Sequence, residues 1–280
     1  MFYIITALSG EAIPIINHFK LKKDISYTKF DLFKNDQIKL ILTGTGKIKS
    51  AIATTYLLVK DNPRPEDHII NIGICGTENE DYKIGHVVLI NKIDDYASRK
   101  TFYPETVFKH NFTEERLITF DKPVKKKDII NLPDCVVDME GSGFYEAASN
   151  YFHAHRIHLL KIVSDYLRGE KLTGAFVQSL IEKNLKNINN LLTATVKTPI
   201  PDANVLTDSD YKLFDQLSND LKLSTTQRFQ ILDLLKSYKV RKGEDINFLK
   251  SYIKSKKTAK ADNKKIFEAI VERLEEVEDE

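Results

Sequence analysis

The chain opens with FYIITALSGE, residues 2–11, an apolar run that ends in small and acidic residues. A short apolar run followed by a turn is typical of a buried strand that feeds a helix. We expect this helix over residues 11–19, because Pro14 is tolerated near a first helical turn. The stretch therefore predicts a strand followed by a helix as the first unit of the fold.

The same alternation continues to about residue 192. Strands are expected at residues 27–33, 37–43, 68–72, 87–93, 117–120, 136–138 and 157–163, and helices at 48–59, 141–152 and 173–192. Residues 95–115 are polar and irregular, which favours a loop or partly formed structure. Alternating strands and helices predict an α/β fold with a mostly parallel central sheet.

Four of the expected strand ends carry small, polar or acidic residues. They are Ser9-Gly10-Glu11, Gly44-Thr45-Gly46, Gly73-Ile74-Cys75-Gly76 and Ser164-Asp165. Ligands of such sheets bind beyond the carboxyl ends of the strands, so these segments predict one ligand site. The glycine turn is neither a dinucleotide fingerprint nor a P-loop, since Ile48 follows Lys47 and Lys49 replaces the third glycine. Lys47 and Lys49 are expected to be solvated.

Residues 202–280 have a different character, with one glycine, no proline and no strand-like run. Apolar positions recur at helical spacing in 209–221, 225–238, 245–253 and 265–277. Ser224 and Gln227 fit a capping box. The sequence thus predicts two domains, an α/β domain over residues 1–200 and an all-helical extension over 201–280.

The composition argues against several classes of function. The 42 basic and 40 acidic residues nearly cancel, so neither nucleic acid nor an anionic membrane is an expected partner. Two cysteines without metal spacing, and histidines at 153, 155 and 158 without a metal-helix pattern, predict no metal. No cofactor motif is complete. Because no apolar run approaches the roughly 20 residues of a membrane span, we expect a cytoplasmic protein.

Taken in order, the strand-end segments resemble the nucleoside phosphorylase superfamily, and within it the methylthioadenosine/S-adenosylhomocysteine nucleosidases and related purine nucleosidases. The matching segments are ALSGE (7–11), TGTGKIKSA (43–51), NIGICG (71–76) with IGHVV (84–88), VDMEG (137–141) and IVSD (162–165). The resemblance covers about residues 1–195. It implies a mixed central sheet flanked by helices, and an enzyme that cleaves the N-glycosidic bond of a purine nucleoside.

The resemblance also assigns roles to three acidic residues. Cleaving this bond places positive charge on the sugar and negative charge on the departing base. Asp165 would protonate or hydrogen-bond the purine at N7, Glu140 would accept the ribose hydroxyls, and Glu11 would activate water. Plain structural alternatives exist, namely a helix cap for Asp165 and first-turn helical glutamates for Glu11 and Glu140.

Five further residues belong to the expected binding site by the same resemblance. Met139 would pack on the ribose face and Ser164 would accompany the base-binding aspartate. The glycine turn and the central strand contribute the others, which are Gly46, Gly73 and Ile74.

Three features favour water over phosphate as the nucleophile. Asn71 and Ile74 stand where related phosphorylases place an arginine and a serine, and Glu11 would repel a bound phosphate. A purine nucleoside phosphorylase remains the alternative. Pro123, in the loop at 119–124 where an aromatic residue is expected, leaves the identity of the nucleoside open.

The resemblance further implies a homo-oligomer, most simply a homodimer. The helical extension raises a non-enzymatic alternative, in which residues 1–200 only bind a nucleoside and residues 202–280 bind a protein partner. The simpler account of the extension is that its apolar residues pack on one another.

Overall fold

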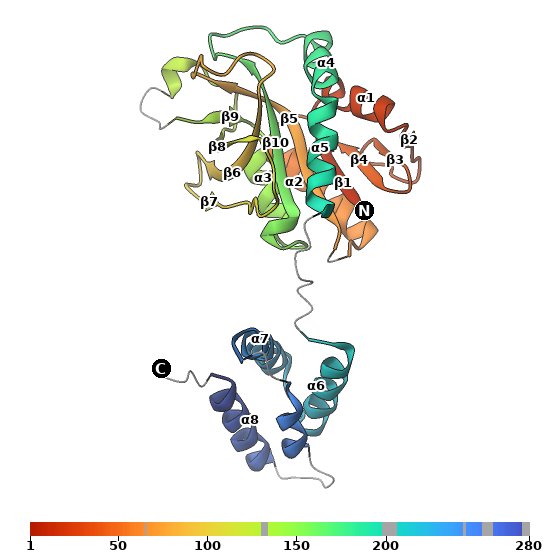
Figure 1. The fold of residues 1–280 in the computed structure, drawn as a ribbon, viewed down its shortest axis with the longest axis vertical. Helices are drawn as coiled ribbons and strands as arrows, with labels where there is room; N and C mark the ends of the chain where they lie inside the picture. The colour runs from red at the N-terminus through yellow and green to blue at the C-terminus, as the bar shows by residue number, and fades with distance from the viewer. Residues whose placement is uncertain (65, 130–133, 198–205, 243–244, 254–259, 276–280) are drawn as a thin grey trace. The chain divides into compact units, whose positions relative to one another are not determined.

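The computed structural model describes the chain except residues 65, 130–133, 198–205, 243–244, 254–259 and 276–280. Two compact units are present, Met1–Thr198 and Pro199–Glu280 (Figure 1). Among the described residues, no helix is both long enough and apolar enough to cross a membrane.

A ten-stranded sheet forms the centre of the N-terminal unit. Its strands are β1 (Phe2–Thr6), β2 (Lys22–Lys23), β3 (Leu32–Lys34), β4 (Ile38–Leu42), β5 (His68–Thr77), β6 (Val87–Asp95), β7 (Thr101–Phe102), β8 (Thr113–Thr119), β9 (Val136–Asp138) and β10 (Ile157–Asp165). Strands β4, β1, β5 and β10 run parallel. Strand β6 is antiparallel to β10, and β9 is antiparallel to β5. The sheet is therefore mixed. The prediction of a mostly parallel sheet, which rested on the alternation of strands and helices, is wrong.

Five of these strands close on themselves. Pairings β5–β10, β10–β6, β6–β8, β8–β9 and β9–β5 form a continuous ring of neighbours. Because β9 pairs with Gly76 and Thr77, β5 continues past Gly73, where the sequence predicted its end. This closure brings the ends of β5, β9 and β10 together at one site.

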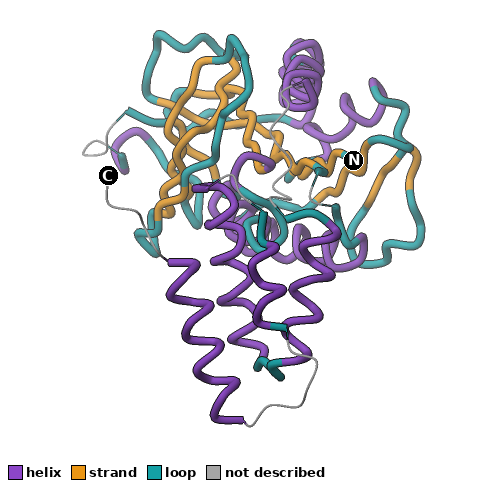
Figure 2. Tube along the Cα trace, turned by 60° about the horizontal axis from the view of Figure 1, so that its bottom comes forward, coloured by secondary structure: helices purple, strands orange, loops and turns teal. Residues whose placement is uncertain are grey.

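Helices cover both faces of the sheet (Figures 1 and 2). They are α1 (Ser9–His18), α2 (Lys47–Asp61), α3 (Gly141–Ala148), α4 (Gly174–Lys183) and α5 (Leu185–Lys197), with short 3₁₀ turns at Lys126–Asp128 and Ala154–Arg156. Helices α2 and α3 bury residues such as Leu57 and Phe144 on one face. On the other face, α1, α4 and α5 bury residues such as Ile15 and Ile188.

Several predicted boundaries differ from those observed. The helix predicted over 173–192 is broken at Asn184, whose amide side chain donates to the carbonyl oxygens of Leu180 and Gly85. The loop predicted over 95–115 contains β7 and the start of β8, since both pair with β6. The first hairpin strand is limited to Leu32–Lys34.

The C-terminal unit is helical, as predicted. It contains α6 (Asp208–Asp220), α7 (Thr225–Lys242), a 3₁₀ segment Asn247–Tyr252 in place of the third predicted helix, and α8 (Lys260–Glu275). The capping box is confirmed by the reciprocal bonds of Ser224 and Gln227, at 3.0 and 3.3 Å. Its apolar residues form a core of their own, with Phe214, Leu235 and Leu249 buried and Phe229 exposed. A protein partner for this unit stays a prediction.

Candidate active site

A cavity of about 400 Å³ lies at the carboxyl ends of the central strands. Its lining includes the three predicted catalytic residues, Glu11, Glu140 and Asp165. The predicted binding residues Met139, Ser164 and Ile74 line it as well. Gly46 and Gly73 do not, but each contacts one of the carboxylates, as described below. The predicted residues are thus brought together, while their roles remain predictions.

Glu11 is fixed in the first turn of α1 by backbone groups. Its Oε2 accepts hydrogen bonds from the amides of Ala7 (2.8 Å) and Leu8 (2.9 Å), and its Oε1 accepts one from Ile74 (3.0 Å). The residue is 2% exposed. Burial raises the pKa of Glu11, although these amides and Lys161 act in the opposite direction. Glu11 does lie in the first turn of a helix, as the structural alternative expected. A first-turn glutamate on a helix surface would, however, be exposed and would not be held by three backbone amides.

The neighbouring strand is shaped to accommodate this carboxylate. A Cβ atom at Gly73 would lie 2.8 Å from Glu11 Oε1, closer than carbon and oxygen can approach without a shift. At Ile74 the contact with Glu11 is made by the backbone amide. A serine hydroxyl at position 74 is therefore not needed to hold Glu11.

Lys161 is a central charged residue that the motif comparison missed. It lies within β10 with its side chain 1% exposed, and its Nζ is 2.8 Å from Asp138 Oδ2. Burial alone would lower the pKa of Lys161, but Asp138, Glu140 and Glu11 together raise it. The lysine is therefore the cationic counterpart of a carboxylate cluster. A lysine inside the mainly apolar run at 157–163 was the available signal.

Glu140 lies between β9 and α3. Its Oε1 accepts the amide of Gly46 (2.8 Å), which positions the glycine turn before α2 against this carboxylate. Burial, followed by the charge of Asp138, raises the pKa of Glu140 to about 7, while Lys161 and the Gly46 amide oppose the shift. A buried carboxyl group beside a cavity can accept hydrogen bonds from a bound hydroxyl-rich ligand.

Asp165 lies at the end of β10, beside Ser164. Its Oδ2 is 2.7 Å from the Ser164 hydroxyl, and its Oδ1 accepts the amide of Leu167 (3.0 Å). The next helix, α4, begins at Gly174 and is capped by Thr173. The helix-cap alternative for Asp165 is therefore wrong, since no helix follows it directly.

Residues 122–125 and the segment after Asp165 form the remaining wall. The cavity is lined there by Lys122, Pro123, Val124 and Lys125, together with Leu167. Pro123 thus faces the cavity where an aromatic residue was expected, and the described lining contains no aromatic side chain. Base stacking on such a ring is not available from the described wall.

The histidines lie elsewhere. His68 Nδ1 is 3.2 Å from His158 Nε2 at the amino end of β5 and β10, and His153 stacks on His155. The described parts of the chain hold no group of three or more metal-ligating side chains. The two cysteines, Cys75 and Cys135, are buried free thiols.

The sequence and the fold both match known proteins. Residues 2–127 match a family described as Phosphorylase superfamily. The N-terminal unit has the phosphorylase-superfamily fold. The superfamily resemblance inferred from the strand ends is thereby confirmed.

Curated relatives of the N-terminal unit include two 5'-methylthioadenosine/S-adenosylhomocysteine nucleosidases. That of Buchnera aphidicola subsp. Schizaphis graminum is 28% identical over 207 residues, which is 62% of this chain and 85% of the relative. That of Maridesulfovibrio salexigens is 27% identical over 104 residues, covering 36% of this chain and only 44% of the relative.

Solved structures resemble the N-terminal unit in fold. The Helicobacter pylori nucleosidase of the same name has a TM-score of 0.59 at 14% identity, covering 69% of this chain and 97% of that one. The futalosine hydrolase of Helicobacter pylori has a TM-score of 0.57 at 16% identity, covering 70% and 96%.

Proposed function

We propose that the N-terminal unit hydrolyses the N-glycosidic bond of a purine nucleoside. The observation that carries the proposal is the convergence of Glu11, Glu140 and Asp165 on one cavity. The similarity to proteins named as nucleosidases and as a hydrolase supports the same reaction class.

Asp165 acts on the base. In its protonated form it donates to N7 of the purine, so that the base leaves as a neutral molecule. The hydroxyl of Ser164 and the amide of Leu167 hold the two carboxyl oxygens of Asp165 in a fixed orientation. Such positioning lowers the cost of proton transfer at the moment the bond breaks.

Glu140 and Met139 act on the sugar. The carboxylate of Glu140 accepts hydrogen bonds from the ribose hydroxyls and favours the positive charge that develops on the ring. Met139 packs against the sugar face. The Gly46 amide holds the Glu140 carboxylate from behind.

Glu11 acts on water. A carboxylate with a raised pKa is a stronger base, and burial raises the pKa of Glu11. Glu11 removes a proton from the water whose oxygen bonds to the anomeric carbon. The N-glycosidic bond breaks, its electron pair goes to the base, and the products are free base and ribose.

Hydrolysis is favoured over phosphorolysis by the charges around the cavity. The described lining contains five acidic residues against two lysines, Lys122 and Lys125, and no arginine; the acidic residues are Glu11, Asp138, Glu140, Asp165 and Glu170. Phosphate binding relies on cationic donors, whereas these carboxylates would repel an anion. A phosphorylase remains the alternative.

The proposal is tested by release of free purine from adenosine, inosine and methylthioadenosine. Wild type is expected to release base from at least one of them. Glu11→Gln is expected to abolish release while retaining nucleoside binding. Failure of the wild type to release base from any nucleoside of the panel would contradict the proposal.

We also propose that the protein is a homodimer acting in the cytoplasm. Ile48, Ile52 and Val59 are exposed along α2, four to eleven residues apart and on one side of the helix. A second copy covering this stripe would bury it. Sedimentation at micromolar concentration should give twice the 32.1 kDa chain mass. A monomer would contradict the assembly.

A further inference from the structure

Residues 121–125, here called the wall loop, are held at both ends by backbone hydrogen bonds. Before the loop, the amide of Phe120 donates to the carbonyl of Asp138 (2.9 Å). After it, the amide of Lys126 donates to the carbonyl of Leu167 (2.9 Å). Between these anchors the loop supplies cavity-lining residues. Its placement therefore sets the width of the proposed site.

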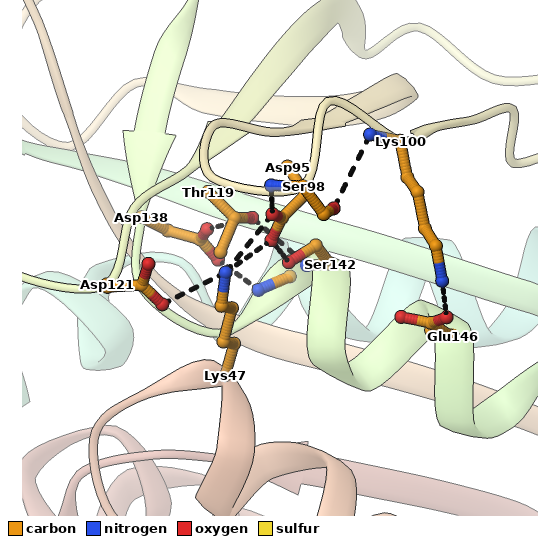
Figure 3. Close-up of polar contacts among 10 residues, drawn as sticks. Lys47, Asp95, Ser98, Lys100, Thr119, Asp121, Asp138, Ser142 and Glu146 are labelled. Atoms are coloured by element: carbon orange, nitrogen blue, oxygen red, sulfur yellow. Dashed lines mark hydrogen bonds and ion pairs between the residues drawn. The ribbon is translucent and has the colours of Figure 1, made fainter.

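Lys47 provides a third anchor, through its side chain. Its Nζ lies 2.9 Å from Asp121 Oδ1 in the wall loop, and 2.8 and 3.1 Å from the two carboxylate oxygens of Asp95. Figure 3 shows Lys47 rising from α2 between these two carboxylates, at the ends of β6 and β8. The expectation that Lys47 is solvated is wrong, because its side chain is 19% exposed and doubly paired.

Asp95 connects Lys47 to the start of α3. Its Oδ2 accepts the hydroxyl of Ser142 (2.7 Å), and its Oδ1 accepts the amide of Ser98 (2.7 Å). Burial alone would raise the pKa of Asp95, but the bonds from Lys47, Ser98 and Ser142 hold it well below its usual range. This end of the contact is therefore a buried, ionised anchor.

Gly46, the residue before Lys47, contacts the carboxylate that is proposed to bind the sugar. The Gly46 amide donates to Glu140 (2.8 Å), so the first turn of α2 touches both a proposed catalytic carboxylate and the wall loop. Gly143 permits this approach, because a Cβ there would lie 2.1 Å from the carbonyl oxygen of Lys47.

We infer that Lys47 is a positioning residue that holds the wall loop against the proposed substrate site through Asp121. The inference rests on the proposed function for the nature of the ligand. Lys47 itself does not line the cavity, so its effect passes through the loop and through the turn that carries Gly46.

The two ends of the contact differ in solvent exposure. Asp95 is 6% exposed in its side chain, whereas Asp121 is 55% exposed. Salt screens exposed pairs far more than buried ones. Raising the ionic strength should therefore weaken the hold on the loop while the buried end stays intact.

Asp121→Ala tests the loop contact with little risk to folding, because the side chain is exposed. We expect the KM for the nucleoside to rise about fivefold, with kcat changed less than twofold. The dissociation constant of an unreactive nucleoside should rise by the same factor. Between about 50 and 500 mM NaCl, the wild-type KM should approach that of the variant, whose own KM should stay constant.

Lys47→Met removes both ends of the contact and Lys47→Arg retains the charge. The methionine variant should show the raised KM and a lower kcat, and the arginine variant should recover most of the loss. The double variant Lys47→Met/Asp121→Ala should add little to the KM of Lys47→Met. Lys100→Met is the matched control, since its pairing with Glu146 lies on the surface beside this network (Figure 3).

The outcomes separate this inference from the proposed function. Unchanged KM and dissociation constant in Asp121→Ala, or a wild-type KM without salt dependence beyond that of the variant, would overturn the positioning role. A wild type that binds nucleoside without cleaving it would overturn the proposed function alone, and the dissociation constants would still test the role of Lys47.

Discussion

The two ends of the paired strands β5 and β10 both bury ionisable side chains, but in opposite ways. Toward the carboxyl end, Lys161 is ionised among Asp138, Glu140 and Glu11. At the amino end, His68 and His158 face each other with Arg156 Nη1 2.7 Å from His68 Nε2. Burial, followed by neighbouring positive charge, lowers the pKa of His68 to about 4 and that of His158 well below its usual value.

The difference lies in the partners available to each group. At the cavity end, the Asp138 carboxylate accepts hydrogen bonds from the Thr119 hydroxyl and the Gly141 amide and forms an ion pair with Lys161. At the other end, His158 Nδ1 has no hydrogen-bond partner among the described residues. Buried side chains with partners of opposite charge stay ionised where a ligand is proposed to bind, whereas the buried histidines, which lie beside a cation, favour their neutral form.

The largest expected effect comes from removing the compensating cation. Lys161→Met leaves Asp138, Glu140 and Glu11 without their buried counterion, so we expect a loss of about 3–5 kcal/mol in the free energy of unfolding. Lys23→Met, which breaks an exposed pair with Asp31, should cost at most about 1 kcal/mol. Urea denaturation at pH 7 measures both. Equal losses of unfolding free energy in the two variants would show that burial does not make the Lys161 ion pair more important for stability than the Lys23 pair.

A smaller effect is expected from the proposed acid. Asp165→Asn cannot supply a proton to the base, so kcat should fall by roughly 10²-fold or more. The melting temperature should stay close to that of wild type, because Asp165 caps no helix. Retained activity together with a lowered melting temperature would make Asp165 a structural residue.

The amino end should respond to acid. A histidine whose pKa is lower when folded takes up protons mainly when unfolded, so stability falls as pH drops below about 6.5 toward 4. For His68 alone, the loss at pH 5 should be about 2 kcal/mol relative to pH 7. His68→Phe should flatten this dependence and the exposed His18→Gln should not. If stability depended on pH in His68→Phe as steeply as in wild type, His68 would not be the source of the acid sensitivity.

Much of this site could be predicted from sequence because its residues follow strand ends. Glu11 and Asp165 follow the parallel strands β1 and β10, whose carboxyl ends lie at one edge of the sheet. Glu140 follows β9, which is antiparallel to β5, and was found through its motif rather than through strand direction. The roles of Lys161 and Lys47 could not be predicted from the sequence. Each lysine is paired with aspartates that are distant in the sequence, which are Asp138 for Lys161 and Asp95 and Asp121 for Lys47. Motif spacing contains no information on such distant pairing.

The extent of β5 and the closed ring of strands were missed for the same reason. Gly73 is a turn signal locally, yet its pairing with Lys161 and the closeness of Glu11 make it part of a strand. Tertiary contacts override local preference where a glycine is required by a neighbour. The identity of the nucleoside depends on the wall loop, for which local sequence offers only Pro123 in place of an aromatic residue.

Hydrolysis at the cavity that contains Glu11, Glu140 and Asp165 can be tested through the identity of the sugar product. Mass spectrometry on a cleaved nucleoside, with and without inorganic phosphate, identifies that product. We predict free ribose, or the corresponding free thioribose, at equal rates in both reactions, and none from Glu11→Gln. A sugar 1-phosphate that forms only when phosphate is present would show phosphorolysis and contradict hydrolysis.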